Sequence, residues 1–428
     1  MNRVQGHVMN ASAFRDSTFP LLPLGNVVTE RAEYVDSIEF PPLSVGIEGI
    51  TKQLEGVAKA ASTSGRKLVR AGDLAINSRS DRRGACGLAS TNGSVSIVNS
   101  VFTPHPEKLV PQFAHYLLRS KAFQEEYFRF GTGIVDDLWS TRFSRMRQIR
   151  IPLPDLPTQR RIADYLDHET AQIDAMTEAL DGLVARLKER HSSVITHYIM
   201  NGIDQEHGPS LSDPLEKSTP ATSDLPPMVQ LRYYAEINPP TPEFTFTEPG
   251  SIITFMPLET VWPNGHAEVD GEITWAGQAR SYVPFRRGDV LLPKVSPTFS
   301  MGRATVANTP HPIGLASSEV YVLRPRKNAD ARFISYAVRS TDFLAEGTSS
   351  QQGVGGLRRV TSGWVGSYKF PQYSLDEQRR IADHLDAETV KIDAMIAKAG
   401  ELRALLDERR SALITATVTG QHPVPEEQ

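Results

Sequence analysis

Lysine and arginine side chains gather in four polar loops of this 428-residue chain, where they could bind a polyanion. The loops read NSRSDRRG at 77–84, LWSTRFSRMRQIR at 138–150, PKVSPTFSMGR at 293–303 and GGLRRVTSGW at 355–364. An arginine can pair with a phosphate or, through two parallel hydrogen bonds, with the edge of a guanine. The pattern predicts nucleic-acid contacts, and a solvated surface charge is the alternative for any single residue. The predicted contacts are Arg79, Arg82, Arg83, Arg142, Arg145, Lys294, Arg303, Arg358 and Arg359.

Motifs for chemistry on a nucleic acid are missing or incomplete. No G-x-x-x-x-G-K-[ST] loop for ATP occurs. The stretch Asn238-Pro-Pro-Thr241 approaches a methyltransferase box, but threonine cannot stack on a flipped base, and the stretch is also an ordinary turn sequence. Asp289 and Lys294 lie on one predicted strand and could suggest a nuclease, yet an aspartate after glycine is commonly a turn residue. The single cysteine, Cys86, and the scattered histidines offer no zinc spacing. We therefore expect no catalytic residue and no metal site.

Charge is distributed unevenly along the chain, although the net charge is only −4. Residues 1–150 carry 19 Lys and Arg against 14 Asp and Glu, and residues 228–372 carry 14 against 12. Both mildly basic blocks contain two of the loops described above, and the intervening segments are acidic. The basic blocks are therefore the parts that we expect to touch a polyanion.

A long internal repeat follows each basic block and must position it. Residues 159–176 read QRRIADYLDHETAQIDAM and residues 378–395 read QRRIADHLDAETVKIDAM. Over 159–196 and 378–415, 22 of 38 aligned positions are identical. Apolar residues recur at alternating steps of four and three, which predicts two helices of about 40 residues, each about 60 Å long. The predicted apolar seam comprises Ile162, Leu166, Ile173, Met176, Leu183, Leu187, Ile381, Leu385, Ile392, Met395, Leu402 and Leu406.

Four charged residues interrupt this seam at matched places and favour an antiparallel pair. Glu169 and Arg190 lie on the first helix, and Glu388 and Arg409 lie on the second. An antiparallel coiled coil brings each glutamate near the arginine of the other copy, whereas a parallel one would bring like charges together. The alternative is that each helix packs only on its own globular block.

The two globular blocks are also related. AGDLAIN at 71–77 corresponds to RGDVLLP at 287–293, and FAHYLLRSKAF at 113–123 corresponds to FISYAVRSTDF at 333–343. Short strands with turn signals predict an α+β domain with a curved or barrel-like sheet in each block. Two similar but divergent blocks suggest recognition of a two-part ligand. The expected parts are blocks at 1–151 and 228–371, long helices at 152–202 and 372–420, a Pro- and Ser-rich linker at 203–227 and a tail at 421–428.

The duplicated LPTQRRI at 156–162 and LDEQRRI at 375–381 resemble the conserved regions of specificity subunits of type I restriction–modification enzymes. The GD-(L/V) and Y-x-x-R-S-x-x-F features resemble the target recognition domains of that family. The resemblance implies two α/β target recognition domains joined by an antiparallel intramolecular coiled coil with pseudo-two-fold symmetry. It also implies a non-catalytic protein that binds a bipartite sequence in double-stranded DNA. Because these recognition domains diverge freely, no base-contacting residue can be carried over.

Partners and cofactors follow from the same resemblance. It implies two copies of a methyltransferase (modification) subunit, as well as restriction or translocase subunits, with S-adenosylmethionine, ATP and Mg²⁺ bound by those partners and not by this chain. Acidic residues on the outward helix faces are candidates for docking the two copies: Asp164, Asp167, Glu169 and Asp174, with Asp383, Asp386, Glu388 and Asp393 at matched places. With no apolar leader, no membrane-length apolar run and one cysteine, we expect a cytoplasmic protein. The rival function is a scaffold that presents two modules to proteins instead of DNA.

Overall fold

The structure of the chain is a computed structural model that divides into two units. Unit 1 comprises residues 1–181 and 400–428, and unit 2 comprises residues 182–399. The residues described are 12–53, 65–79, 84–133, 139–203, 226–262, 265, 267–277, 281–353 and 357–425.

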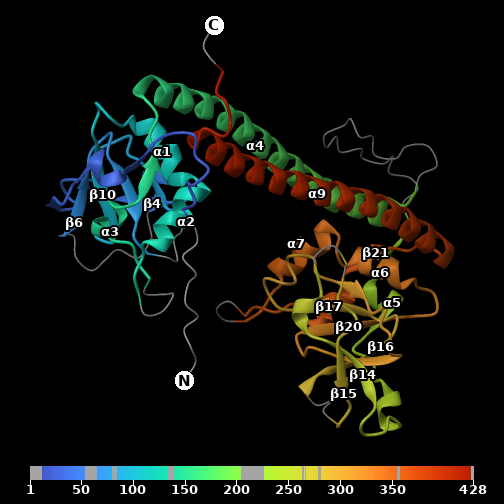
Figure 1. The fold of residues 1–428 in the computed structure, drawn as a ribbon. Helices are drawn as coiled ribbons and strands as arrows, with labels where there is room; N and C mark the ends of the chain where they lie inside the picture. Colours follow the sequence, from blue (N-terminus) through green and yellow to red (C-terminus); the bar gives the residue numbers. More distant parts are fainter. Residues whose placement is uncertain are drawn as a thin grey trace. The chain divides into compact units, whose positions relative to one another are not determined.

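A four-stranded antiparallel sheet forms the centre of unit 1 (Figure 1). Its order is β2 (Val28–Glu30), β10 (Asn99–Pro104), β7 (Leu74–Asn77) and β8 (Cys86–Leu88). All four residues of β7 are buried, as expected of the apolar run LAIN in a central strand. Gly72, with φ of 91°, makes the turn into this strand, and a positive φ is readily adopted only by glycine.

Unit 2 repeats this sheet with the same strand order: β13 (Ala235–Ile237), β20 (Val320–Pro325), β17 (Val290–Pro293) and β18 (Thr305–Val306). Leu74 lies opposite Phe102 in unit 1, and Val290 lies opposite Leu323 in unit 2. Since the two GD turns immediately precede Leu74 and Val290, the registers of the two sheets correspond residue by residue.

The helices around the central sheets are duplicated as well. Unit 1 has α1 (Pro111–Arg119), α2 (Lys121–Arg129) and α3 (Phe143–Met146), and unit 2 has α6 (Ala331–Ala337), α7 (Thr341–Ser349) and α8 (Ser362–Ser367). A two-stranded pair leads into each long helix: β1 (Leu21–Pro23) with β11 (Arg150–Pro152), and β12 (Met228–Gln230) with β21 (Lys369–Pro371). Unit 2 adds the short α5 (Leu231–Tyr234).

The second sheets of the two units differ in their number of strands. Unit 1 has a three-stranded sheet of β3 (Tyr34–Val35), β6 (Arg66–Val69) and β9 (Gly93–Val95), with a hairpin of β4 (Leu43–Gly46) and β5 (Gly49–Lys52). Unit 2 has a four-stranded sheet of β15 (Glu272–Thr274), β14 (Ile252–Met256), β19 (Ile313–Ala316) and β16 (Val283–Arg286), in which β14 and β19 are parallel. In the described residues these are separate sheets and not one closed barrel.

The repeat forms two long helices, α4 (Leu156–Asn201) and α9 (Leu375–Val418). Asp155 accepts a hydrogen bond from the Thr158 amide at the start of α4, which satisfies one of the unpaired donors of the first turn. Gly202 and Gly420 follow the last turns with φ of 76° and 77°, the left-handed conformation that terminates a helix.

In unit 1, the beginning of α4 runs antiparallel to the end of α9. Asp174 pairs with Arg410 and Asp181 pairs with Arg403, so the residue number rises on one helix as it falls on the other. Ile162 and Leu166 of α4 share one core with Ile414 and Val418 of α9 and with the side chains of α1 and α2. The long helices therefore pack on each other and on the globular block at once.

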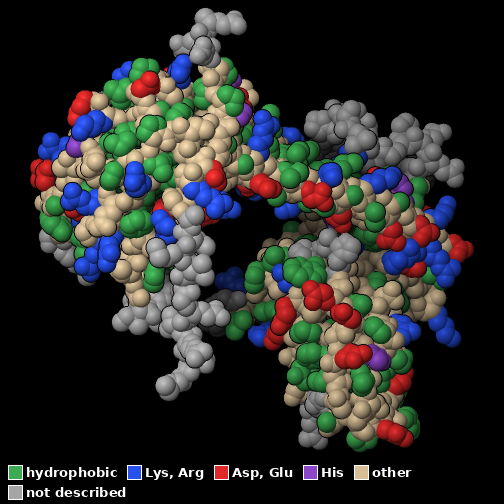
Figure 2. Space-filling model, viewed as in Figure 1, with side chains coloured by type: hydrophobic (Ala, Val, Ile, Leu, Met, Phe, Trp, Pro, Cys, Tyr) green, Lys and Arg blue, Asp and Glu red, His purple; other side chains and the backbone are tan. Residues whose placement is uncertain are grey.

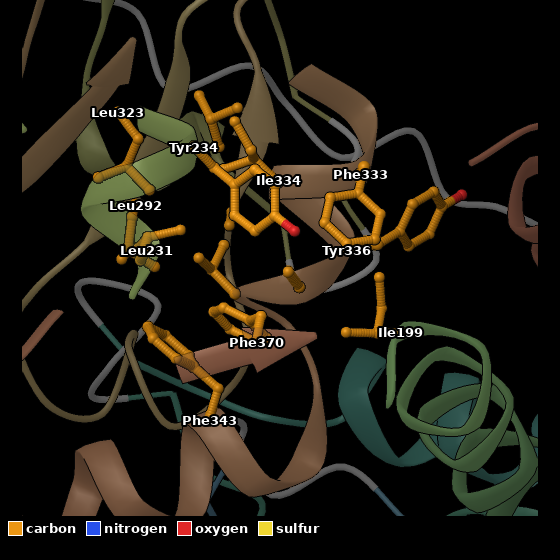
Figure 3. Close-up of a cluster of buried hydrophobic side chains, with 14 of the residues drawn as sticks. Ile199, Leu231, Tyr234, Leu292, Leu323, Phe333, Ile334, Tyr336, Phe343 and Phe370 are labelled. Carbon is orange, nitrogen blue, oxygen red and sulfur yellow. The ribbon is translucent and has the colours of Figure 1, made fainter. Parts of the chain in front are cut away.

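Unit 2 is built in the same way, except that here the end of α4 packs against the beginning of α9. The ring centroids of Tyr198 on α4 and His384 on α9 lie 4.3 Å apart. Val194, Ile195 and Ile199 of α4 join Ile381 and Leu385 of α9 in the core of the block. Figure 3 shows Ile199 pointing toward Tyr336 and Phe370 of that core. His191 of α4 also lies 3.9 Å from Asp393 of α9, so the antiparallel pairing expected from the sequence is present in each unit.

Near the middle of the helices, some residues of the predicted apolar seam are more exposed than expected. The side chains of Ile173, Leu187, Ile392 and Leu406 are buried, as are the seam residues near the helix starts. In contrast, Met176, Leu183, Met395 and Leu402 are between 40% and 50% exposed. A single partner helix cannot cover the full apolar stripe where no globular block is in contact with it.

Only one of the two expected seam ion pairs forms. Glu169 lies 3.9 Å from Arg409 in unit 1. In unit 2, Glu388 instead bonds Lys391, one turn along its own helix, at 2.7 Å. This hydrogen bond is the main cause that lowers the pKa of Glu388, and the more distant charge of Arg190 adds to it. The difference arises because the first copy has Gln172 where the second has Lys391.

Candidate nucleic-acid interface

Unit 1 carries an open polar groove at the end of its central sheet where β7 finishes. Arg79 and Arg142, both predicted as contacts, lie on this groove, and Lys67 of β6 lies there too. Figure 2 shows Lys and Arg side chains spread over the sheet side of unit 1, with fewer Asp and Glu side chains among them. The groove is lined by Glu30, Lys67, Ser78, Arg79, Ile97, Val98, Asn99, Ser100, Trp139, Ser140, Arg142 and Phe143.

Backbone pairing brings the two basic loops of unit 1 together. Ser140 forms a bridge with Arg79 and a second bridge with Thr132. The Thr141 amide donates to the Ser78 carbonyl at 3.0 Å. The Ser140–Arg79 bridge and the Thr141–Ser78 hydrogen bond join segments more than 60 positions apart, which local sequence spacing could not reveal.

The other predicted residues of unit 1 are placed differently. Arg82 and Arg83 lie outside the described residues. Arg145 is exposed on α3 and is not part of the groove lining. Lys67, which was not predicted from the sequence, donates through Nζ to the Asn99 carbonyl at 2.8 Å. In the sequence, Lys67 could be noticed only as a charged residue within the strand RKLV, in which alternate residues face opposite sides of the sheet.

The corresponding edge of unit 2 holds Lys294 and Arg359. Arg359 forms bridges with Val295 and Gln352, and the Val360 amide donates to the Lys294 carbonyl at 3.0 Å. The Lys294 ammonium lies 5.3 Å from the ring centroid of Tyr321. Two predicted basic loops of this unit are therefore joined by the same backbone pattern as in unit 1.

Arg359 is ion-paired. Its Nε and Nη2 atoms each donate to a carboxylate oxygen of Glu319 at 2.8 Å. The hydrogen bond from Arg359 is the main cause that lowers the pKa of Glu319, and the positive charges of Arg359 and Lys294 add to it. Glu319 was not predicted, because a lone acid before a strand carries no signal for such a pair.

Arg303 and Arg358 lie in the same region of the chain with different surroundings. The Arg303 guanidinium lies 5.9 Å from the ring centroid of Trp262, a cation–π arrangement. Arg358 is exposed, and among the described residues its side chain makes no ion pair. The structure thus places Lys294, Arg358 and Arg359 on neighbouring positions, with Arg303 two residues before the start of β18.

Corresponding positions of the two sheets carry different side chains. The bridge partners show that Ser140 of unit 1 corresponds to Arg359 of unit 2, and Arg79 corresponds to Val295. The amides of Ser78 and Lys294 donate to Val98 and Glu319, which makes these two acceptors equivalent. The same scaffold therefore presents a different set of polar groups in each unit.

The GD turns and the NPPT stretch have structural partners. Asp73 is bonded by Arg31 at 2.6 Å and by Thr103. Asp289 is held by two nitrogens of Arg324, at 2.8 and 3.0 Å. Both aspartates are buried, which leaves no free carboxylate at these turns for a nuclease site.

Asn238, with φ of 48°, turns the chain after β13, and its side-chain oxygen accepts from the Val322 amide. The carbonyl of Pro240 and the hydroxyl of Thr241 accept from Arg324. This stretch is a turn fastened to the central sheet.

Most of the acids expected on outward helix faces are used within their own unit. Asp167 accepts from the Tyr116 hydroxyl at 2.5 Å, and Asp386 accepts from the Tyr336 hydroxyl at 2.7 Å. Burial, together with these carboxylates, raises the pKa of each tyrosine to about 12. Asp167 and Asp386 therefore help to fix the blocks to the long helices, and the docking of partner subunits by the acidic faces stays a prediction. Partners also hold Asp174 with Arg410, Asp383 with Arg332, and Asp393 with His191.

Two kinds of feature are absent from the described residues. No group of three or more His, Cys, Asp or Glu side chains in this part of the chain could hold a metal ion. In the same residues, no helix is both long enough and apolar enough to cross a membrane.

One part of the chain is similar to a known family. Residues 45–183 match the family described as the type I restriction modification DNA specificity domain. Two curated relatives from Escherichia coli, the specificity subunits of the type I restriction enzymes EcoEI and EcoAI, are each 27% identical over 150 residues. That stretch is 34% of this chain and 25% of each relative, so the chain spans about a quarter of the length of the curated relatives it matches.

Solved structures share the fold over nearly the whole chain. A chain from a study of complex assembly and conformational transition in the type I R-M system superposes with a TM-score of 0.68 at 17% identity. The match covers 94% of this chain and 98% of that one. The HsdS subunit from Thermoanaerobacter tengcongensis gives a TM-score of 0.50 at 19% identity, covering 94% and 97% of the two chains.

Proposed function

We propose that this chain, which contains a type I restriction–modification DNA specificity domain and has the fold of the specificity subunit HsdS, selects the DNA sequence on which such a system acts. In this proposal each unit binds one half of a bipartite target in double-stranded DNA. The chain itself catalyses nothing. The carrying observation is that both units place basic side chains on the same edge of a duplicated sheet.

The geometry supports DNA as the ligand of that edge. Arg79, Arg142 and Lys67 surround an open groove together with amide and hydroxyl groups, a mixture that suits phosphates and base edges. The divergence between the two units suits two different half-sites. Arg79 and Arg142 both lie within the part of the chain that matches the specificity domain.

The assembly would include two copies of a methyltransferase (modification) subunit and, in the complete system, restriction or translocase subunits. S-adenosylmethionine, ATP and Mg²⁺ would be bound by those partners. The half-exposed Met176, Leu183, Met395 and Leu402 are better candidates for a docking surface than the acids, most of which are already paired. We propose a cytoplasmic location, where a buried free thiol such as Cys86 is stable.

Genome-wide mapping of methylated bases tests the function directly. A bipartite motif should be methylated in cells that carry the gene and should vanish when the gene is deleted. An unchanged methylation pattern would contradict the proposal.

The rival scaffold function makes a different prediction for purified material. If the assembled complex binds duplex DNA, its affinity should fall steeply with salt, because counterions are released from each neutralised phosphate. A scaffold for proteins alone would show no such binding. The match to a DNA specificity domain favours the first outcome.

A further inference from the structure

The Arg359–Glu319 pair in unit 2 uses only one edge of the guanidinium. Nε and Nη2 donate in parallel to the two carboxylate oxygens, both at 2.8 Å. A guanidinium has five N–H donors in a rigid planar fork. The carboxylate occupies one donor of Nε and one of Nη2, which leaves three donors on the Nη1 side.

The remaining donors form a second fork. One Nη1 hydrogen is directed to the Leu357 carbonyl, which lies at 3.5 Å. The other Nη1 hydrogen and the second Nη2 hydrogen lie side by side at the end of the side chain. Two parallel donors match the O6 and N7 acceptors of a guanine in the major groove. Arg359 remains 43% exposed, so this end is accessible.

The backbones of Arg359 and Glu319 are both held in place by hydrogen bonds. The Arg359 amide donates to the Gln352 carbonyl, and its own carbonyl accepts from the Gln352 amide, both at 2.9 Å. The Glu319 carbonyl accepts from the Lys294 amide at 2.9 Å, next to the start of β20. A guanidinium whose plane and position are fixed in this way loses little entropy on binding.

The charge of the pair argues for base reading and against phosphate binding. Glu319 cancels much of the positive charge of Arg359, so the pair attracts a phosphate weakly. Its directional donors are unaffected. The corresponding position in unit 1, Ser140, lines the groove described above, which places Arg359 at the edge that faces the ligand.

We propose that Arg359 reads a guanine in the half-site bound by unit 2, through its Nη1–Nη2 edge, and that Glu319 is the positioning residue that holds this edge outward. The inference rests on the proposed DNA-binding function. The neighbouring Arg358 is a matched contrast, since it has the same charge, lies on the same loop and makes no ion pair in the described residues.

The test uses the full-length chain, copurified with the methyltransferase subunits of its own host. A randomised duplex DNA library first yields the preferred sequence of the wild-type complex. Duplexes with each single base change are then measured with the wild-type complex and with Arg359→Ala, Glu319→Gln and Arg358→Ala, over a series of salt concentrations. Thermal unfolding of each variant checks folding.

Arg359→Ala should abolish a preference of roughly 10- to 100-fold for guanine at one position and leave the other positions unchanged. Glu319→Gln should weaken the same preference and steepen the salt dependence, because the released guanidinium can bind phosphate. Arg358→Ala should lower affinity for all sequences alike. A purely structural pair would instead lower thermal stability and affinity with every base preference retained.

Arg359→Lys covers the case in which the alanine variant does not fold. Lysine keeps the charge but cannot offer two parallel donors, so guanine preference should still be lost. If the variants keep every wild-type preference, or lose one for a base other than guanine, the inference is wrong and the proposed function stands. If the wild-type complex selects no sequence at all, the proposed function fails and the inference with it.

Discussion

Single side chains account for how one scaffold presents two different polar surfaces. Unit 1 places arginines at 79 and 142, whereas unit 2 places its cations at 294 and 359. The buried aspartate of the GD turn shows the same freedom. Its arginine partner comes from Arg31, just after β2, in unit 1 and from Arg324 on β20 in unit 2. The aspartate keeps an arginine partner in both units, but the arginine comes from a different part of the sheet in each.

Arg79 and Arg142 should act together in unit 1. With both replaced by alanine, we expect DNA affinity of the assembled complex to fall and the slope of log affinity against log salt to decrease by up to about 2, since about one counterion is released per phosphate contact. Salt-dependent binding measurements check this. Arg145→Ala, exposed but outside the groove lining, is the control. Equal effects of the control and the double variant would contradict the assignment of the groove.

The buried His115 should make the folded chain less stable in acid. Burial, with the nearby charge of Arg119, lowers its pKa to about 4 from 6.5, and Asp167 opposes this. Below pH 6.5 the unfolded chain binds a proton that the folded chain does not, so stability should decrease between pH 6.5 and 4 by about 3 kcal/mol in total. Urea unfolding as a function of pH measures it. His115→Gln should remove this slope, and the exposed His168→Gln should leave it; equal slopes in both variants would oppose the explanation.

At the scale of elements, a buried glutamine fastens each long helix to its block. Gln159 accepts from the Val110 amide at 2.8 Å and donates to the carbonyls of Lys108 and Pro154. Gln378 makes the same three kinds of bond with Asp330, Asn328 and Tyr373. Both glutamines are fully buried, which explains why the repeated QRRIA begins with this residue.

Gln159→Leu should therefore destabilise unit 1 by about 2–4 kcal/mol, because it leaves three backbone groups without partners in a site closed to water. Urea unfolding gives the value. Gln172→Leu, on the exposed face of the same helix, should change stability by less than about 0.5 kcal/mol. A similar result for both variants would show that the three hydrogen bonds contribute little.

The elements with strong periodicity could be predicted from the sequence, and those that depend on distant pairing could not. The long helices, their glycine ends and their antiparallel direction follow from a repeated heptad and its misplaced charges. In the second sheets, the antiparallel pair β6–β9 of unit 1 corresponds to the pair β16–β19 of unit 2, but these strands share no sequence repeat that would have revealed them. Lys67 and Glu319 were not predicted as site residues because their roles depend on strands far apart in sequence. Met176 was predicted to lie on the packed seam, yet it is half exposed. An apolar period implies that a partner covers the helix, but it does not show which residues that partner reaches.

At the scale of the molecule, each unit is completed by residues from distant parts of the chain. Ile414 and Val418, near the end of α9, belong to the core of unit 1 with Phe113 and Leu166. Thr18 donates its amide to the Thr419 carbonyl at 3.0 Å. The first block therefore depends on the second long helix for its own stability.

Ile414→Ala should destabilise unit 1 by about 2–4 kcal/mol through the cavity it leaves. Hydrogen exchange should show lost protection in residues 12–153 and unchanged protection in residues 228–371. Leu405→Ala, at a 60% exposed position of the same helix, serves as the control. Loss of protection confined to α9 would mean that the first block is stable without it.

This dependence has a consequence for synthesis on the ribosome. About 250 residues separate Leu166 from Ile414, so at about 5–20 residues per second the first block waits roughly 10 to 50 s for its last core residues. During that interval the apolar faces of Ile162 and Leu166 lack the contacts that α9 supplies. The nascent chain therefore presents a chaperone-binding surface for longer than a protein whose first domain closes on itself.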